Sequence, residues 1–166
     1  YIWSEDDWQT DNTVENGAYR MSKSLAEREA WKLSQELNIE MVSICPSFIL
    51  GPVLNSRADA ASVSFMESLI DGSTESVSAA AFGVVDVRNV AQAHVNAMHV
   101  DLSLNGLRNS SGEARFVLSS EDSIPRENIA KALLQSNEFQ GWPVPKKSDG
   151  PPLQSLLYSN ERARKY

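Results

Sequence analysis

The sequence predicts an α/β fold built around a parallel sheet, and two observations carry this prediction. Helical patterns and short extended runs alternate along the chain in the order helix, strand, loop, helix, short strand, helix, strand, helix. The clearest extended runs, within 40–44 and 115–119, are short and largely apolar, as expected of strands buried on both faces of a parallel sheet. The helices between such strands are expected to cover the faces of the sheet.

The composition is that of an ordinary globular domain, and it argues against several kinds of partner. Of the 166 residues, 42% are hydrophobic and 22% are charged, so the chain can bury a core. The net charge is −7 and no Lys/Arg-rich block is present, which argues against nucleic acid or an anionic membrane as a partner. No apolar run approaches the roughly 20 residues of a membrane helix. No signal peptide is visible either, and we expect a cytoplasmic protein.

Metal chemistry is not expected. Cys45 is the single cysteine, so neither an internal disulfide nor a cysteine-based metal site can form. His94 and His99 are the only histidines, and no other metal ligand lies near them at a suitable spacing. His94 falls within a helical pattern and is expected to be packed rather than catalytic.

The longest helical pattern has its expected entry at Asn16 or Gly17 and runs to Leu37. Apolar side chains recur there every three or four residues and predict a stripe that faces the core. The members of this stripe are Ala26, Ala30, Leu33 and Leu37. The opposite, solvated side is predicted to carry Arg20, Ser24, Glu27, Gln35 and Glu36.

Tyr19 and Lys23 lie four residues apart at the start of this helix. That spacing places both side chains on one face, within reach of a shared ligand. A nearby ammonium favours the phenolate and lowers the pKa of a tyrosine, which makes the phenol a usable general acid or base for a carbonyl or alcohol oxygen. The lysine has three donors and can also hold a polyol such as a ribose. The alternative is an ordinary helix start with a half-exposed tyrosine and a snorkelling lysine.

The segment after this helix predicts a buried strand that ends in a rigid turn. Residues 40–44 read as a parallel strand, and Pro46, Gly51 and Pro52 are expected to prevent its regular continuation. Ligands of open parallel sheets bind outside the carboxyl ends of the strands. A Pro-Ser turn at that edge could present backbone groups to a cofactor, and a plain exit from the strand is the alternative.

The remaining elements follow from apolar spacing and from capping residues. A helix is predicted over 60–70, ending before Gly72. Asp86 is predicted to cap the next helix. Its buried side is expected to carry Val87, Val90, Ala91, Ala93, His94, Ala97 and Met98. A further helix is predicted after Pro125. The remaining expectations are a loop or edge strand over 73–81, an extended run over 82–85, an extended surface segment over 142–152 and a helical pattern over 156–166.

Four segments resemble, in the same order, those of the extended short-chain dehydrogenase/reductases, and most closely the dihydroflavonol 4-reductase and cinnamoyl-CoA reductase group. Tyr19–Glu27, followed by Ala30-Trp31, resembles the active-site helix of that group. The loop Trp3–Asp7 and the segments Cys45–Pro52 and Val85–His94 resemble three further landmarks. Together the four segments span nearly the whole chain.

The resemblance implies an NADP-dependent oxidoreductase that reduces a small-molecule carbonyl to an alcohol. Tyr19 would be the proton donor, and Lys23 would hold the nicotinamide ribose and lower the tyrosine pKa. The residues implied to contact the cofactor are Tyr19, Lys23, Pro46, Ser47, Phe48, Ile49 and Ser62. Asp86 is interpreted as a helix cap. A homodimer is an open alternative for the assembly.

The resemblance covers only part of the family pattern. The glycine-rich turn that binds the pyrophosphate, the basic residue that selects NADP over NAD and the catalytic serine have no counterpart in these residues. We therefore expect residues 1–166 to form a single fragment, the C-terminal half of a reductase with both ends cut. The implied fold is a partial Rossmann-like, doubly wound parallel sheet that lacks its N-terminal Gly-rich half and keeps the small C-terminal substrate-binding region.

Two other functions remain open from the sequence. The chain could belong to a non-catalytic binding protein that has kept the scaffold. It could also belong to an NAD-dependent sugar-nucleotide epimerase or a sterol dehydrogenase of the same superfamily. The loop of Trp3–Asp7 and the Ala30-Trp31 pair favour the reductase group.

Overall fold

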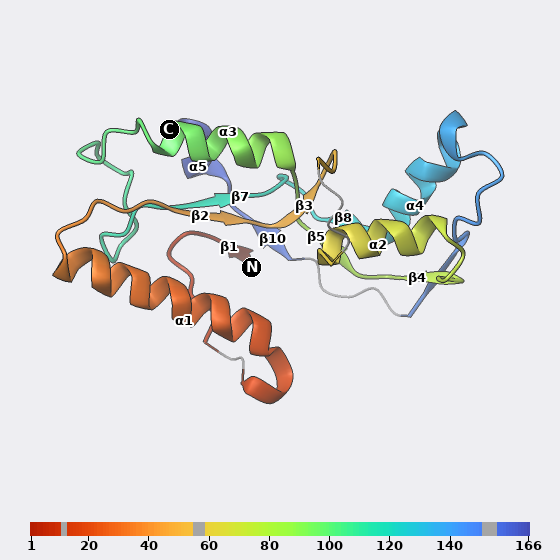
Figure 1. Cartoon of the computed structure of the whole chain (residues 1–166), viewed down its shortest axis with the longest axis horizontal. Helices are drawn as coiled ribbons and strands as arrows, with labels where there is room; N and C mark the ends of the chain where they lie inside the picture. Colours follow the sequence, from red (N-terminus) through yellow and green to blue (C-terminus); the bar gives the residue numbers. More distant parts are fainter. Residues whose placement is uncertain (11–12, 55–58, 151–155) are drawn as a thin grey trace.

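The computed structural model describes residues 1–10, 13–54, 59–150 and 156–166, and it shows an α/β architecture (Figure 1). The helices are α1 (Val14–Glu36), α2 (Ala61–Ile70), α3 (Val87–Ala97), α4 (Arg126–Gln135) and α5 (Glu161–Lys165), with a 3₁₀ turn at Asn137–Phe139. The strands are β1 (Ile2–Trp3), β2 (Ser43–Pro46), β3 (Phe48–Leu50), β4 (Ser76–Ser78), β5 (Ala81–Phe82), β6 (Val84–Asp86), β7 (Arg115–Leu118), β8 (Ile124–Pro125), β9 (Lys147–Asp149) and β10 (Leu157–Tyr158).

The described strands pair two by two, and parallel pairing prevails, as the sequence predicts. β2 pairs with β7, with Ser43 opposite Arg115, and β3 pairs with β6, with Phe48 opposite Val84. β1 pairs with β10 and β4 with β9, again in parallel. Only the short pair of β5 and β8 is antiparallel.

The strand spans Ser43–Pro46 rather than the predicted 40–44, and Pro46 ends its regular course, as the sequence suggests. It is the last residue of β2, and the chain resumes as β3 after Ser47. The backbone N–H groups of Ser43 and Ser47 point towards β7 and donate to the carbonyls of Ala114 and Leu118. The backbone nitrogen of Pro46 therefore points away from β7, so the missing N–H group of proline breaks no hydrogen bond to that strand. Phe48 then donates to the carbonyl of Gly83, which carries the chain across to β6.

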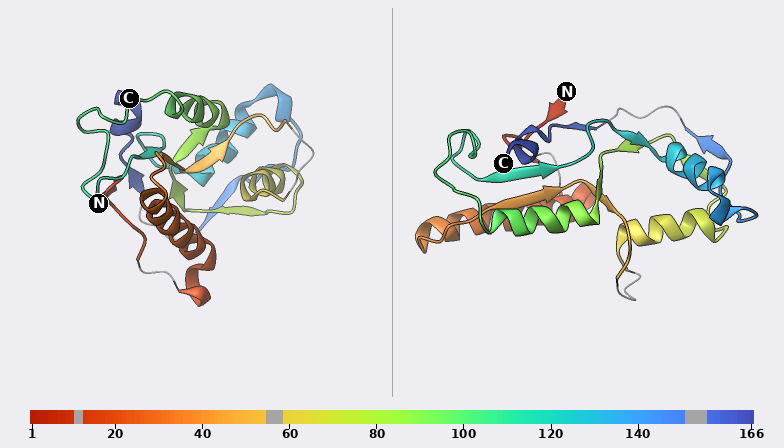
Figure 2. Two further views of the ribbon diagram at one scale, coloured as in Figure 1. Left: turned by 60° about the vertical axis from the view of Figure 1, so that its left-hand side comes forward. Right: turned by 90° about the horizontal axis from the view of Figure 1, so that it is seen from above.

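Helices cover both faces of the central strands. α1 lies on one side of β2 and β7, while α3 and α5 lie on the other (Figures 1 and 2). Trp31 of α1 belongs to one buried cluster with Leu107, Ala114 and Phe116, and Val90 of α3 belongs to another with Val85 and Leu118. A second, smaller body holds α2, α4, β4 and β9, and its core consists of Leu69, Val77, Ala130 and Val144.

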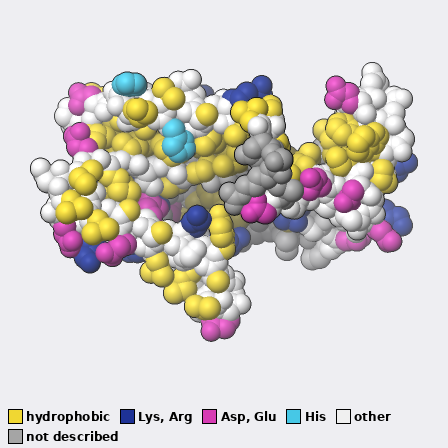
Figure 3. Space-filling model, in the orientation of Figure 1, with side chains coloured by type: hydrophobic (Ala, Val, Ile, Leu, Met, Phe, Trp, Pro, Cys, Tyr) yellow, Lys and Arg dark blue, Asp and Glu magenta, His cyan; other side chains and the backbone are white. Residues whose placement is uncertain are grey.

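The core-facing stripe predicted for α1 is wrong. Leu33 and Leu37 are 43% and 63% exposed, and Ala26 is exposed as well. The side that faces the sheet carries Glu27 and Trp31 instead. Figure 3, in which hydrophobic side chains are yellow, shows many of them exposed on the face of the molecule that it presents. The reason is that a helix can bury a carboxylate when a cation elsewhere in the fold pairs with it. The spacing of apolar residues along a helix does not reveal such a partner.

Two other details of the helices also differ from the prediction. α1 begins at Val14, before the expected entry, and Gly17 interrupts its helical backbone. On α3, the predicted inner positions Ala91, His94 and Met98 are exposed, because the helix contacts the sheet through a narrow side that includes Val90.

The end of the chain is not one continuous helical pattern. Leu157 and Tyr158 form β10, which pairs with β1, and α5 starts only at Glu161. The predicted cap of α3 by Asp86, the glycine after α2 and the helix after Pro125 are all present. The end of the predicted segment over 142–152, with Pro151 and Pro152, lies outside the described residues. No helix within the described ranges is both long and apolar enough to cross a membrane.

Candidate active site beside helix α1

A cavity of about 640 Å³ opens between α1, the carboxyl end of β2 and the N-terminal loop. Its walls combine side chains from segments far apart in the sequence. The described residues that line it are Trp3, Ser4, Asp7, Trp8, Gln9, Tyr19, Arg20, Lys23, Ser24, Glu27, Ser43–Ser47, Arg115, Val117, Leu156 and Tyr158. The cavity therefore brings the start of α1 to the edge of the sheet where ligands of parallel sheets bind.

Tyr19 and Lys23 both line this cavity and lie together on α1. The Lys23 Nζ atom is 5.5 Å from the centroid of the Tyr19 ring. Tyr19 is 74% exposed, so its phenol is accessible to a ligand that enters the cavity. The structure thus brings the pair together, and the catalytic roles of the two residues stay a prediction.

Pro46 and Ser47 line the same cavity from the end of β2. The Oγ atom of Ser47 is buried and has no hydrogen-bond partner among the described residues. A buried hydroxyl without a partner is costly, so a polar group of a ligand would be favoured beside it. Ser47 and Lys23 thus line one cavity, and a role for either in holding a cofactor stays a prediction.

The other residues predicted to contact a cofactor do not appear among those that line the cavity. The Phe48 ring packs on the rings of Phe65 and Phe82, at centroid distances of 5.6 and 4.4 Å. Ile49 packs against the core that contains Val85. Ser62 lies in the first turn of α2. A cofactor contact through the backbone of these residues stays a prediction.

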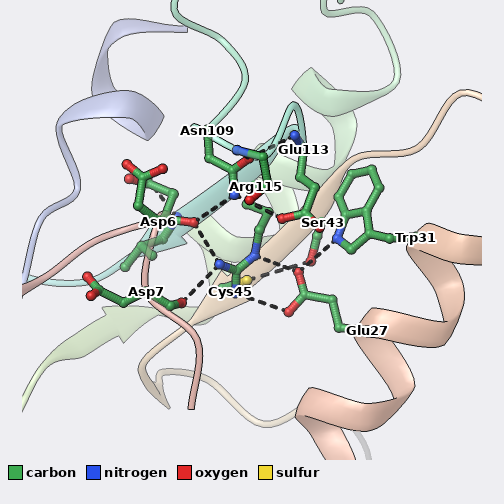
Figure 4. A network of polar contacts seen from close by, with 12 residues as sticks. Asp6, Asp7, Glu27, Trp31, Ser43, Cys45, Asn109, Glu113 and Arg115 are labelled. Atoms are coloured by element: carbon green, nitrogen blue, oxygen red, sulfur yellow. Dashed lines mark hydrogen bonds and ion pairs between the residues drawn. The ribbon is translucent and has the colours of Figure 1, made fainter. Parts of the chain in front are cut away.

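The floor of the cavity is formed by Arg115, which is only 7% exposed (Figure 4). Its Nε and Nη2 atoms donate to the two carboxylate oxygens of Glu27, at 2.8 and 3.2 Å. Its Nη1 atom donates to the backbone carbonyls of Glu5 and Asp7, at 2.7 and 3.0 Å. The guanidinium also lies 4.0 Å from the centroid of the Trp8 ring. Arg115 therefore ties α1, β7 and the N-terminal loop together.

Glu5 adds a second connection between the loop and the strand. Its carboxylate is buried and accepts a hydrogen bond from the backbone N–H of Val117, at 3.1 Å. The side-chain amide of Asn109 donates to the Glu5 carbonyl at 3.1 Å and to the Glu113 carboxylate at 2.9 Å. The loop that precedes α1 is thus held by buried hydrogen bonds rather than by apolar contacts alone.

The polar groups around Arg115 differ in how readily they ionise. Burial disfavours the Glu27 carboxylate, but hydrogen bonds from Arg115, Ser43 and Trp31 outweigh that cost and hold the pKa of Glu27 below its usual value. Burial and the nearby Glu27 carboxylate raise the pKa of the Cys45 thiol. Because the thiolate is the reactive form, Cys45 is not activated as a nucleophile at neutral pH.

No protein-family model matches the chain. It is similar to cinnamoyl-CoA reductase CAD2 of Medicago truncatula, with 40% identity over 79 residues, which are 48% of this chain and 24% of that protein. It is also similar to tetraketide alpha-pyrone reductase 1 of Arabidopsis thaliana, with 30% identity over 130 residues, which are 78% of this chain and 36% of that protein.

Solved structures agree on the fold. Vestitone reductase from alfalfa superposes with a TM-score of 0.68 at 22% identity, over 99% of this chain and 51% of that one. MoeE5 in complex with UDP-glucuronic acid and NAD superposes with a TM-score of 0.67 at 17% identity, over 99% of this chain and 52% of that one. The chain thus spans about half the length of these two proteins.

The chain belongs to the extended short-chain dehydrogenase/reductase family. Within this family, its relatives include dihydroflavonol reductase-like and cinnamoyl-CoA reductase-like proteins. Among the described residues, no three or more His, Cys, Asp or Glu side chains are placed to hold a metal ion.

Sequence reasoning missed Arg115 and misplaced Glu27, although both line the cavity of this reductase-family chain. One signal was available. Arg115 begins a strand whose other residues, Phe116, Val117 and Leu118, are apolar, and an arginine in a buried strand requires a partner. The sequence does not name that partner, because Glu27 is remote along the chain.

Proposed function

We propose that the protein carrying this chain is an NADP-dependent carbonyl reductase and that the cavity beside α1 is its reaction centre. The observation that carries this proposal is the placement of Tyr19 and Lys23 in one cavity, next to the carboxyl end of β2. The names of the relatives support reduction as the reaction, since they include a cinnamoyl-CoA reductase, an anthocyanidin reductase and a dihydroflavonol 4-reductase.

In this proposal each residue has a defined task. NADPH, when bound, supplies the hydride that is transferred to the carbonyl carbon. The Tyr19 hydroxyl donates its proton to the carbonyl oxygen, so that the carbonyl becomes an alcohol. Lys23 holds the ribose hydroxyls and stabilises the tyrosinate that remains after the proton has left. Pro46 and Ser47 form the wall of the cavity that would face the nicotinamide. The Ser47 hydroxyl, which has no partner among the described residues, would bond a polar group there.

The substrates that we propose are aldehydes or ketones related to dihydroflavonols or cinnamoyl-CoA. Trp3 lines the same cavity as Tyr19 and offers aromatic surface to such a ring-bearing substrate. Titration with NADPH and with NADH measures the preference for the dinucleotide, and we expect tighter binding of NADPH.

The test is to replace Tyr19 by Phe in the full-length protein. We expect turnover of cinnamaldehyde or dihydroquercetin with NADPH to fall by roughly 100- to 10,000-fold, because the proton donor is lost, while the affinity for NADPH changes little. NADPH oxidation is followed at its absorbance band, and cofactor binding by fluorescence. Tyr166→Phe is the matched control, because this phenol bonds the Asn105 carbonyl outside the cavity. Full turnover by Tyr19→Phe would reject Tyr19 as the acid.

A second candidate is a sugar-nucleotide epimerase, favoured by the fold that the chain shares with the NAD- and UDP-sugar-bound MoeE5. Conversion of UDP-glucose in the presence of NAD, without net change in the dinucleotide, would identify it. A protein that binds either dinucleotide but converts none of these compounds would instead fit the non-catalytic alternative.

A further inference from the structure

Glu27 continues the side of α1 that carries Tyr19 and Lys23. The three residues follow one another at intervals of four, so they stand nearly above one another on the helix, and all three line the same cavity. Any contact that fixes Glu27 therefore limits how α1 can rotate or slide, and with it the position of the other two side chains.

Arg115 supplies that contact, and it does so from a rigid base. It begins β7, whose four residues are all buried and which pairs along its full length with β2. Two of its nitrogens meet the two oxygens of Glu27 in a fork, which fixes direction as well as distance. Figure 4 shows the guanidinium between the helix and the loop, with Glu27 on one side and the loop carbonyls on the other.

The same guanidinium fixes the loop that forms the opposite wall. It bonds the carbonyls of Glu5 and Asp7, and it stacks on Trp8, whose ring lies 4.4 Å from the Arg28 guanidinium of α1. One side chain thus sets the distance between the helix and the loop, and hence the width of the cavity that they enclose.

Stability alone is a weak explanation for this arrangement. Buried ion pairs often stabilise a fold no more than apolar residues of the same volume would, whereas they do impose one geometry. Catalysis depends on such geometry, since a misplacement of about 1 Å can lower a rate about 100-fold.

We propose that Arg115 and Glu27 are positioning residues, which hold Tyr19 and Lys23 at the correct height and angle in the cavity. This inference rests on the proposed reductase function and adds to it a structural determinant of the rate. Neither residue exchanges a proton with the substrate. Their effect passes through the orientation of α1 and of the loop that contains Trp8.

The experiment compares three variants of the full-length protein with cinnamaldehyde, dihydroquercetin and NADPH. Arg115→Lys keeps the charge but loses the fork, and Glu27→Gln keeps the shape but loses the charge. Arg88→Lys is the control, since Arg88 pairs with Asp86 on an exposed part of α3. We expect kcat per folded, NADPH-binding molecule to fall roughly 10- to 100-fold in the first two variants, with KM for the carbonyl substrate little changed. Arg88→Lys is expected to match the wild type.

Chemical rescue separates positioning from general loss of structure. In Arg115→Ala, added guanidinium at millimolar concentration is expected to recover part of kcat, while urea, which has a similar shape but no charge, is not. If Arg115→Lys does not fold, Glu27→Gln provides the same comparison.

The outcomes distinguish this inference from the proposed function. A wild type that reduces neither compound overturns both. A wild type that is active and depends on Tyr19, together with full kcat in Arg115→Lys and Glu27→Gln, overturns the positioning role alone. So does an Arg115→Ala variant whose lost kcat does not respond to guanidinium.

Discussion

At the scale of single residues, Gly83 shows how tightly the chain closes beside the cavity. A Cβ atom at this position would overlap the Ser119 Oγ atom and lie 3.0 Å from Cδ2 of Tyr158. The Gly83 carbonyl also accepts a hydrogen bond from the amide of Phe48, at 3.0 Å, so the backbone cannot retreat without loosening β3. The position therefore has no room for a side chain.

Replacing Gly83 by Ala is expected to destabilise the protein by about 1–3 kcal/mol, because the added methyl group overpacks a filled site. Urea unfolding followed by circular dichroism measures the change. Adding Ser119→Ala removes the hydroxyl that the methyl group would meet, and the double variant is expected to regain part of the loss. A double variant no more stable than Gly83→Ala would show that the clash lies elsewhere.

At the scale of elements, the start of α3 depends on one carboxylate. Asp86 accepts a hydrogen bond from the backbone N–H of Arg88 at 2.8 Å, as a helix cap does, and two more from the Arg88 guanidinium. These hydrogen bonds, the side-chain ones foremost, lower the pKa of Asp86 to about 2. The folded pKa thus lies below the reference value of 3.8, so the cap stabilises the fold above about pH 4 and is lost as the pH falls through about 2.

The variant Asp86→Asn is therefore expected to have a lower thermal midpoint than the wild type at pH 6. The difference should shrink as the pH falls from about 4 towards 2, because the wild-type carboxylate then takes up its proton. Thermal unfolding at pH 6, 4 and 3 measures it. A difference that stays constant over this range would contradict the role of the charge.

At the scale of the whole molecule, the chain forms two packed bodies rather than one. Trp31, Leu107 and Phe116 belong to one buried cluster, whereas Leu69 and Val77 belong to a separate one. The candidate site lies entirely against the first body. Local loosening of the second body should therefore spread little to the floor of the cavity.

Replacing Leu69 by Ala tests this separation. Leu69 is fully buried, and its truncation is expected to cost about 2–5 kcal/mol. Hydrogen exchange should then accelerate in α2, α4 and β4 but not in β2 and β7. Leu54→Ala is the control, because Leu54 is 94% exposed. Equal acceleration in β2 and β7 would show that the two cores open as one unit.

The sequence by itself determined the features that depend on neighbours along the chain. The four-residue spacing of Tyr19 and Lys23, the cap at Asp86 and the glycine at position 72 all follow from local backbone geometry, and the structure contains each of them. The parallel α/β class likewise follows from the order of helices and strands.

Only the tertiary structure decided which face of α1 turns inward and what supports the site. Arg115 and Glu27 meet across the fold, as do β1 and β10, and no local pattern encodes such pairs. A charged side chain is assigned to solvent by its hydropathy until a partner at a distance compensates its burial. The pairing of Glu27 with Arg115 therefore turns a different face of α1 towards the sheet than the one predicted, although Tyr19 and Lys23 do lie side by side as predicted.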